Sequence, residues 1–389
     1  MPLALPGESV RARPIGKRAG HTVYEAEAWL RRSPERAEPP CPHFGACGGC
    51  AVQHLADAAY ARWKLSLLTE ALARAGFTDA PVAPLARTPP GARRRADFAL
   101  ARQGGVAVGF HARRESRVQD LSACPVLHPD LFALVAPLRA LLPGLACLKR
   151  AGSAVVNLLE SGPDLLLRTE APPDLAARNR LAVFARVNGL VRVSWAPPRG
   201  EPETLAQLRP PIITLSGQAV VAPPGAFLQA SREGEEAIVA ALLAGLPPRA
   251  RRFADLYAGL GTLSFALATR GTVAAFEGDG AALGALGAAA GGTRVRAVQR
   301  DLARQPLQAS ELAGFDAVVL DPPFAGAAAQ VATIAASRVR HVAYVSCNPA
   351  ALARDARRLR EAGFAMLSAT PVDQFLWSAQ LEAVVHFGR

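Results

Sequence analysis

From about residue 233 to the end of the chain, short apolar runs alternate with longer segments in which apolar residues recur at helical spacing. The runs that we expect to form strands are 252–257, 272–277, 317–320 and 341–345. Strands that alternate with helices in this way are typical of βαβ units and of a doubly wound parallel sheet. The sequence therefore predicts an α/β, Rossmann-like domain, which we bound at residues 216–389.

The region before this domain has mostly the pattern of short strands. Between about 92 and 200, Gly, Ser or Pro turns separate apolar runs at 98–101, 106–110, 155–159 and 165–169. Short runs bounded by such turns indicate strands. We therefore expect a β-rich central domain over residues 41–215.

Two further segments complete the expected organisation. Residues 57–76 carry apolar positions at helical spacing and stop at a glycine, which predicts a helix that could pack on the C-terminal domain. Residues 1–40 alternate polar and apolar positions at 8–12 and 21–26, around a turn. Two short extended pieces are too little for an independent domain.

Composition and charge narrow the function. A chain of 389 residues with half of its side chains apolar can bury more than one core. Its net charge of +12 favours an anionic partner, and nucleic acid fits more simply than a membrane surface. No uncharged apolar stretch reaches the roughly 18 residues that span a bilayer, and no basic region followed by an apolar run opens the chain. We expect a cytoplasmic protein without membrane association, in which cysteines serve metal binding or catalysis rather than disulfides.

The first predicted strand of the C-terminal domain runs into a glycine-containing loop at 258–262. Glycines there let the backbone turn tightly and approach a ligand. A second strand ends at Glu277, where a carboxylate can hold both hydroxyls of a ribose. These features together predict an adenosine-containing cofactor. S-adenosylmethionine is our preferred interpretation, with a dinucleotide or a mere packing turn as alternatives.

Two more strand ends carry candidate chemistry. Asp321 and two prolines follow the run 317–320, and Cys347 follows the run 341–345 after one serine. In open α/β sheets, ligands bind at the carboxyl ends of the strands, so both residues should lie at one sheet edge. Taken alone, Asp321 could be a capping residue and Cys347 an inert core thiol.

One reaction needs a thiol and an acid together at such an edge. Carbon 5 of uracil is a poor nucleophile, but a thiolate that adds to carbon 6 creates an enolate whose carbon 5 can attack the methyl group of a sulfonium. The carbon 5 proton must then leave, which needs a general base. Glu382, just before a terminal apolar run, can fill that role.

Related reactions fit less well. Cytosine-5 enzymes that act on RNA are expected to show a cysteine beside the proline of the Asp-Pro motif, where this chain has Pro323. Enzymes that methylate amino groups need no cysteine. Carbon 5 of uridine is therefore the best fit.

Four of the six cysteines form a second candidate site. Cys41, Cys47 and Cys50 have the spacing C-x5-C-x2-C, and Cys124 offers a fourth thiolate. This spacing differs from common zinc knuckles and suits an iron–sulfur cluster, with zinc as the alternative.

Taken together, these motifs resemble the RNA 5-methyluridine methyltransferase family, in the branch that carries a [4Fe–4S] cluster and modifies 23S ribosomal RNA. The resemblance covers about 41–389 in patches. It implies a class I methyltransferase domain, S-adenosylmethionine as methyl donor and 23S rRNA as partner, with Cys347 as nucleophile and Glu382 as base. The residues implied as cluster ligands are Cys41, Cys47, Cys50 and Cys124. Those implied for the cofactor are Gln229, Tyr257, Glu277 and Asp321, with Thr262 and Asp301 where further contacts are usual.

The chain departs from the family pattern in places. Residues 1–40 could supply only the latter half of the RNA-binding β-barrel (TRAM-like) that usually opens these proteins, which predicts a truncated barrel. Phe324 stands where arginine is common, and Thr262 where asparagine is frequent. The basic segments 93–95 and 113–117 could contact phosphates or could be solvated hairpin faces.

Two other functions stay open at this point. The first is a uridine-5 methyltransferase of the same family that acts on tRNA. The second is a catalytically silent iron–sulfur protein that binds RNA. In each case we expect a monomer with no obligate protein partner.

Overall fold

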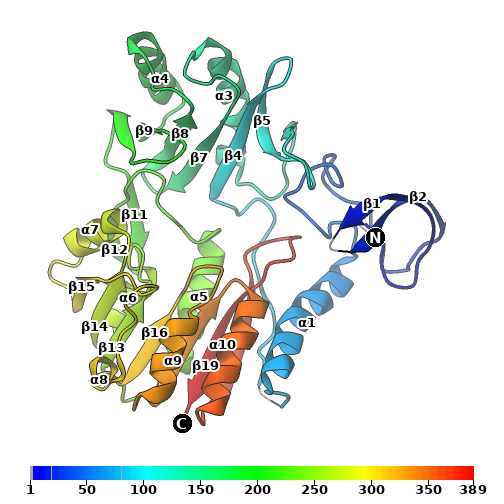
Figure 1. Cartoon of the computed structure of the whole chain (residues 1–389). Coiled ribbons are helices and arrows are strands. Elements are labelled where there is room, and N and C mark those ends of the chain that lie inside the picture. Colours follow the sequence, from blue (N-terminus) through cyan, green and yellow to red (C-terminus); the bar gives the residue numbers. More distant parts are fainter. Residues whose placement is uncertain (1–2, 19, 80) are drawn as a thin grey trace.

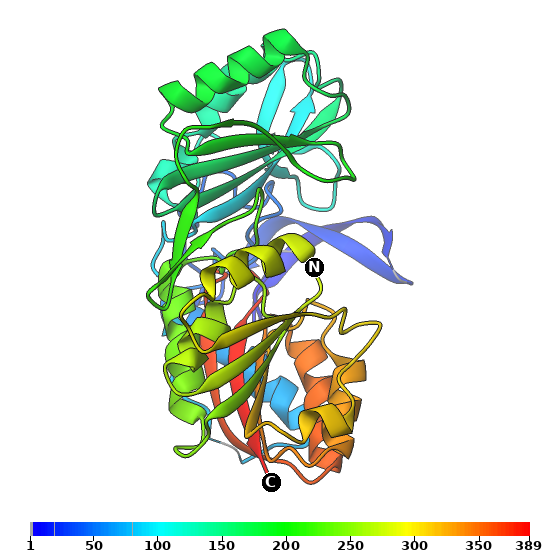
Figure 2. The ribbon, with the colours of Figure 1, turned by 90° about the vertical axis from the view of Figure 1, so that its left-hand side faces the viewer.

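The computed structural model describes residues 3–18, 20–79 and 81–389. It contains two sheet-based units, stacked one above the other, with a pair of N-terminal strands projecting beside the junction (Figure 1, Figure 2). The upper one, built on a seven-stranded sheet, is called here the central unit, and the lower one, built on an eight-stranded sheet, the C-terminal unit.

The C-terminal unit contains the predicted parallel sheet. Its strands are β3 (Ala86–Arg87), β13 (Arg252–Leu256), β14 (Thr272–Glu277), β15 (Val295–Gln299), β16 (Ala317–Leu320), β17 (His341–Ser346), β18 (Ala365–Asp373) and β19 (Glu382–Gly388). The order across the sheet is β15-β14-β13-β16-β17-β19-β18-β3, and β19 runs antiparallel to both of its neighbours. The four strands expected in this region are confirmed. They are almost wholly apolar because helices cover both faces of the sheet.

The helices of this unit lie on the two faces of the sheet and enclose two apolar cores. They are α5 (Arg232–Gly245), α6 (Thr262–Ala268), α7 (Gly280–Ala289), α8 (Ala309–Leu312), α9 (Ala328–Ala336) and α10 (Pro349–Glu361). In the described part of the chain, no helix is both long and apolar enough to cross a membrane.

Three segments from earlier in the chain pack with the C-terminal unit. The predicted helix is confirmed as α1 (Asp57–Ala75), which ends at Gly76 in a left-handed conformation (φ 91°) and lies along α10 (Figure 1). Strand β3 extends the sheet beside β18. The hairpin of β11 (Ile212–Leu215) and β12 (Gln218–Val221) packs on α6 and α7. The domain boundary at residue 215 stays a prediction, because α1, β3 and the β11 strand of the hairpin precede it in the sequence and yet pack with the C-terminal unit.

The central unit is a seven-stranded sheet with helices packed on it (Figure 2). Its strands are β4 (Arg95–Arg102), β5 (Val106–His111), β6 (Val118–Asp120), β7 (Ala151–Leu159), β8 (Gly162–Thr169), β9 (Arg192–Ala196) and β10 (Glu203–Gln207). Its helices are α2 (Pro129–Phe132), α3 (Val135–Leu141), the 3₁₀ turn η1 (Leu142–Gly144) and α4 (Leu175–Val187). They bury one large apolar core with the sheet.

The N-terminal region forms a two-stranded hairpin of β1 (Ser9–Arg18) and β2 (His21–Arg31). Within the described residues these strands pair with each other and with no third strand. Glu8 fixes the base of the hairpin, because its carboxylate accepts hydrogen bonds from Arg36 Nε (2.6 Å) and Trp29 Nε1 (3.0 Å). The hydrogen bond from Arg36 is the main reason that the pKa of this carboxyl lies well below its usual range.

Candidate functional site

One edge of the C-terminal sheet collects most of the residues that the sequence singled out. Tyr257 follows β13, Glu277 ends β14, and Asp321 follows β16. Cys347 follows β17, and Glu382 begins the antiparallel strand β19. The pairing of β17 with β19 is in register at their ends, which sets Cys347 beside Glu382. Reversal of one strand therefore brings an acid from near the end of the chain to the edge where the parallel strands end.

The loop after β13 has the backbone that its glycines predict. Gly259 and Gly261 have φ values of 56° and 97°, in the left-handed region that favours glycine. A Cβ added at Gly259 would meet no atom within 4 Å, so the loop faces open space there. Tyr257 shares this conformation (φ 66°), and burial raises the pKa of its hydroxyl to about 12. Thr262 is the first residue of α6.

Glu277 holds the glycine loop in place. Its Oε2 accepts a hydrogen bond from Gly259 N (2.8 Å), and its Oε1 accepts one from Gly278 N (2.7 Å). A Cβ added at Gly278 would lie 3.5 Å from Asp301 Cα, so the loops after β14 and β15 touch. Asp301 is exposed and accepts a hydrogen bond from Ala303 N within its own turn (3.1 Å). The two carboxylates therefore border the loop that we expect to approach an adenosine-containing ligand.

Sequence analysis missed Asp255, a fully buried acid in β13. Its Oδ2 accepts a hydrogen bond from Ser264 Oγ (2.5 Å), while its Oδ1 has no partner among the described residues. Burial raises the pKa of this carboxyl to about 7, and the charges of Asp321 and Glu277 also raise it. The sequence feature that could have identified Asp255 is its position as the one acid in an otherwise mostly apolar strand.

Two glutamines connect the acids at the sheet edge. Gln229 Nε2 donates a hydrogen bond to Asp321 Oδ2 (3.1 Å). Gln374 Nε2 donates to Gln229 Oε1 (2.8 Å) and to Glu382 Oε2 (2.8 Å). The structure thus joins Gln229, Asp321 and Glu382 in one network. Gln374, which follows β18, was not singled out from the sequence.

The electrostatics of this edge disfavour negative charge. Burial raises the pKa of Cys347 to about 12, and the charges of Glu382 and Asp321 contribute to the shift. Burial also raises the pKa of Glu382, and the charge of Asp321 raises it further. Burial raises the pKa of Asp321, against the hydrogen bond from Gln229, which lowers it. These mutual influences mean that the thiol and the two carboxyl groups lie close together.

The Asp-Pro-Pro segment after β16 is held by the helix that follows Cys347. Asn348 Nδ2 donates a hydrogen bond to Phe324 O (2.9 Å). Asp355, buried in α10, accepts hydrogen bonds from Ala327 N (2.8 Å) and Tyr344 Oη (2.7 Å). The backbone of this loop is therefore fixed, while the Phe324 side chain remains 57% exposed.

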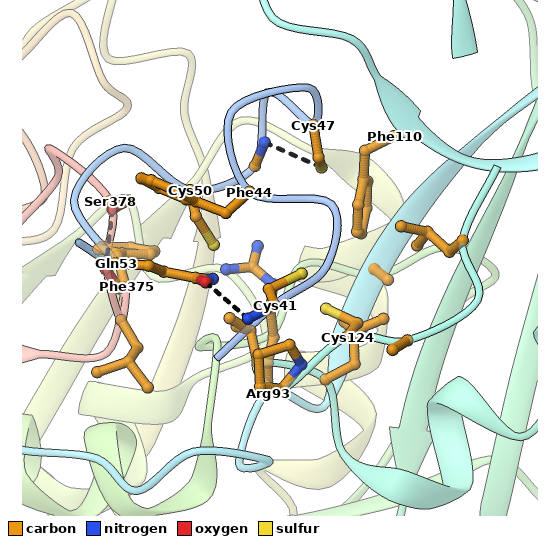
Figure 3. A pocket seen from close by; sticks show the side chains of 18 of the residues that line it. Cys41, Phe44, Cys47, Cys50, Gln53, Arg93, Phe110, Cys124, Phe375 and Ser378 are labelled. Carbon is orange, nitrogen blue, oxygen red and sulfur yellow. Dashed lines mark hydrogen bonds between the residues drawn. The ribbon is translucent and has the colours of Figure 1, made fainter. Parts of the chain in front are cut away.

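The four cysteines of the second candidate site line one cavity of about 420 Å³ (Figure 3). Cys41, Cys47 and Cys50 come from the loop before α1, and Cys124 comes from the loop after β6. Burial raises the pKa of Cys50 to about 12, and the charges of the other three thiols raise it further. Among the described residues, the structure shows no group of three or more His, Cys, Asp or Glu side chains placed to hold a single metal ion.

Within the basic segment 93–95, the structure contradicts both a phosphate contact and a solvated hairpin face for Arg94. Arg94 is buried and forms an ion pair with Glu235 (2.7 Å), and Arg93 lines the cysteine cavity. Neither is part of a solvated hairpin face. In the segment 113–117, by contrast, Arg114 and Arg117 are exposed.

A buried ion pair braces the segment between β18 and β19. Lys64, on α1, is fully buried, and its Nζ lies 2.7 Å from Asp373 Oδ1 at the end of β18. The same Nζ donates hydrogen bonds to Phe375 O (3.1 Å) and Gln380 O (2.5 Å). Tyr60 Oη donates to Asp373 Oδ2 (2.5 Å). Sequence analysis found neither Lys64 nor Asp373.

Comparison with known proteins places this architecture in a family. No family model matches the chain. Proteins named as uncharacterized RNA methyltransferases from Caulobacter vibrioides and Brucella melitensis are 41% and 40% identical to it, over 100% and 99% of this chain and 94% and 91% of their own lengths. A Chromohalobacter salexigens protein named 23S rRNA (uracil(1939)-C(5))-methyltransferase RlmD is 36% identical over 98% of this chain and 82% of its own length.

The fold has a counterpart among solved structures. The Pyrococcus abyssi tRNA (uracil-54, C5)-methyltransferase, solved in complex with S-adenosyl-L-homocysteine, matches 99% of this chain with a TM-score of 0.75 and 20% sequence identity, over 94% of its own length. The fold is that of a class I methyltransferase, which confirms the predicted α/β class. From its relatives, the chain belongs to the RNA methyltransferase family, and the protein is an RNA methyltransferase.

Proposed function

We propose that the protein methylates carbon 5 of a uridine in 23S rRNA, using S-adenosylmethionine and a covalent bond between Cys347 and carbon 6. The observation that carries this proposal is the convergence of one thiol and two carboxyl groups at the sheet edge. The register of β17 with β19 sets Cys347 beside Glu382, and Gln229 and Gln374 link Asp321 to Glu382. Methylation of an amino group needs no thiol, whereas carbon 5 of uracil requires a nucleophile at carbon 6 to become reactive.

The residues of the glycine loop fit an adenosine cofactor, since the loop faces open space at Gly259 and acids border it. When bound, S-adenosylmethionine supplies an electrophilic methyl group on a positively charged sulfur. Glu277 would hold the ribose hydroxyls. The other residues proposed to surround the cofactor are Gln229, Tyr257, Thr262, Asp301 and Asp321.

The proposed reaction divides between Cys347 and Glu382. The thiolate of Cys347 forms a bond to carbon 6, and the electron pair of the C5–C6 double bond moves onto carbon 5 and its neighbouring carbonyl oxygen. Carbon 5 then forms the new carbon–carbon bond to the methyl group, the bond between that methyl group and the donor's sulfur breaks, and the sulfur leaves uncharged as a thioether. Glu382 removes the remaining proton from carbon 5, the double bond re-forms, and the carbon–sulfur bond breaks to return the thiolate.

The raised pKa values have a place in this scheme. A thiolate is the nucleophile and a thiol is not, and burial, with the charges of Glu382 and Asp321, raises the pKa of Cys347 and favours the thiol. The thiol must therefore lose its proton to solvent water as the substrate binds, because Glu382 has to stay ionised for the carbon 5 proton. Burial and the charge of Asp321 raise the pKa of Glu382, so its ionised carboxylate is a stronger base than that of an exposed glutamate.

For the cysteine cavity we propose a [4Fe–4S] cluster held by Cys41, Cys47, Cys50 and Cys124. All four thiols line one cavity, and thiolates are the ligands of such clusters. The ligands of a cluster stand farther apart than those of a single ion, because the inorganic core lies between them. Among the described residues no group of three or more His, Cys, Asp or Glu side chains is placed to hold a metal ion, so the proposal rests on the shared cavity and on the chemistry of the four thiols.

Ribosomal RNA is proposed as the substrate over transfer RNA. The relative named for a 23S rRNA uracil is 36% identical to this chain, whereas the structural counterpart named for a tRNA uracil is 20% identical. A tRNA uridine-5 methyltransferase is the second candidate.

Transfer of labelled methyl groups from S-adenosylmethionine to unmodified 23S rRNA and to bulk tRNA tests the proposal, with nucleoside analysis of the product. We expect 5-methyluridine in 23S rRNA. Label in tRNA alone would favour the second candidate. RNA binding without any label would leave a catalytically silent RNA-binding protein.

A further inference from the structure

Gln374 lies at the centre of the polar network at the sheet edge. It directly follows β18, is 3% exposed, and uses both ends of its side-chain amide. Nε2 donates hydrogen bonds to Glu382 Oε2 and to Gln229 Oε1, each 2.8 Å long. Oε1 accepts a hydrogen bond from Ala230 N (2.9 Å). Every hydrogen bond of this amide is therefore directed at the candidate site or at the loop that carries Gln229.

The partners fix the orientation of this amide. A backbone N–H can only donate, so the Gln374 atom that faces Ala230 N must be the oxygen. With the oxygen fixed there, the nitrogen is the atom that faces Glu382 and donates to its Oε2. Gln229 then presents its own oxygen to Gln374 and its nitrogen to Asp321 (3.1 Å). Hydrogen bonds therefore run outward from Gln374 in two directions, to Glu382 directly and to Asp321 through Gln229.

We propose that Gln374 is a positioning residue for the removal of the carbon 5 proton, because it holds Glu382 by Oε2 and leaves Oε1 as the atom that takes the proton. This inference rests on the proposed function. Glu382 is 3% exposed, and its Oε1 has no hydrogen-bond partner among the described residues. A buried carboxyl oxygen without a partner is costly, and a proton delivered from the substrate would satisfy it.

Helix α5 leaves space for the Gln374 side chain at Gly234. Gly234 stands in its first turn, although glycine inside a helix costs roughly 1 kcal/mol relative to alanine. A Cβ added at Gly234 would lie 2.7 Å from Gln374 Cβ and 3.1 Å from Gln374 Oε1. The missing side chain lets the amide lie against the helix, so Gly234 and Gln374 form one packing arrangement.

The surroundings of Glu382 determine how pH should act on it. The titratable and charged groups packed around Glu382 and Gln374 are Asp321, Cys347 and the ion pairs Arg94–Glu235 and Lys64–Asp373. Burial and the charge of Asp321 raise the pKa of Glu382, and the hydrogen bond from Gln374 lowers it. A general base acts in its ionised form, so the rate rises with pH through this pKa. Loss of the Gln374 hydrogen bond should move that rise to higher pH.

The test compares Gln374→Met with Gln330→Met in the full-length protein. Methionine keeps the length of glutamine and removes its hydrogen bonds. Gln330 is a matched control, because it is fully buried on α9 and exchanges hydrogen bonds with the backbone of Leu307 (2.9 and 3.2 Å) outside this network. Thermal unfolding and S-adenosylmethionine binding establish that each variant is folded.

Single-turnover reactions with 23S rRNA over a range of pH give two readouts, methyl groups in RNA and covalent protein–RNA adduct. For Gln374→Met we expect methyl transfer to proceed while resolution of the adduct slows by roughly tenfold or more. Complete loss of a general base typically slows a reaction by ~10²–10⁴-fold, and loss of its positioning residue should cost no more than that. The pH at which resolution becomes fast should rise. Gln330→Met should resolve its adduct with the wild-type pH profile.

The outcomes separate the two proposals. A folded wild-type protein that transfers no methyl group to uridine contradicts the proposed function itself. If the wild-type protein transfers methyl groups but Gln374→Met resolves its adduct as fast as Gln330→Met, the role of Gln374 is overturned and the proposed function stands. Should Gln374→Met not fold, Gln374→Glu keeps the shape and sets a second carboxyl against Glu382. It is expected to shift the pH profile in the same direction, and an unshifted profile would overturn the inference.

Discussion

The two candidate sites of this protein are constructed differently. At the sheet edge, the residues stand at the ends of strands, and their polar groups are linked to one another, as Gln374 is to Glu382 (2.8 Å). In the cysteine cavity, the thiols come from two loops, at 41–50 and at Cys124, which lie outside the sheets and helices. The fold therefore pre-forms the first site. The second site has no comparable hydrogen-bond network among its thiols in the described residues, and a cluster there remains a proposal.

One segment nevertheless belongs to both sites. Phe375 and Gln380 line the cysteine cavity, while Gln374 and Glu382 lie at the two ends of the same segment and belong to the sheet edge. Lys64 secures the segment from α1. A substitution at Cys347 should therefore leave the cavity intact. A substitution in the cavity or at Lys64, by contrast, can alter the position of Glu382.

The largest effect is expected from Cys347→Ala. Without the thiol no bond to carbon 6 can form, so methyl transfer and covalent capture of RNA should both fall to background. Any visible absorption from the proposed cluster should not change. Cys147→Ala, in the buried core of the central unit, is the matched control. Full activity in Cys347→Ala would remove the covalent mechanism.

Glu382→Gln should stall the reaction after methyl transfer. The amide keeps the shape of the carboxyl group but cannot accept the carbon 5 proton, so the methylated RNA should remain bound to Cys347. Denaturing gels with labelled methyl groups would show one label for each trapped protein–RNA adduct. Adduct that resolves at the wild-type rate would show that another group removes the proton.

Lys64→Met should destabilise the protein. Removing one partner of a buried ion pair typically costs about 3–5 kcal/mol, because the other charge, here that of Asp373, is left without compensation. Denaturant unfolding measures the loss, and Lys149→Met, at an exposed position, is the control. A Lys64→Met protein as stable as the control would mean that α1 does not secure the shared segment.

Sequence patterns located the strand ends and missed the links between them. Glu277, Asp321 and Cys347 each follow an apolar run, and the parallel sheet brings such ends together whatever their separation in the chain. Gln374 follows a strand as well, but its partners Gln229 and Glu382 are set by tertiary packing. No periodicity in the sequence reports that packing.

Helix α1 carries a sequence pattern that predicts a buried ion pair. Tyr60, Lys64, Leu68 and Leu72 recur every four residues, so they share one helix face, and all four are buried. A lysine on an otherwise apolar stripe predicts a buried partner of opposite charge. The partner, Asp373, lies more than three hundred residues later, and only the fold could identify it.

The smallest effect on methyl transfer is expected from Cys50→Ser. Loss of one thiolate should abolish the visible absorption of the proposed cluster and weaken RNA binding, while Cys347 and Glu382 remain in place. Cys147→Ser, whose residue does not line the cavity, is the control. An unchanged absorption spectrum in Cys50→Ser would refute the cluster. A folded Cys50→Ser variant that binds RNA but accumulates the methylated adduct would instead show that the cavity affects Glu382 through the segment 374–382, because Phe375 and Gln380 of that segment line the cavity.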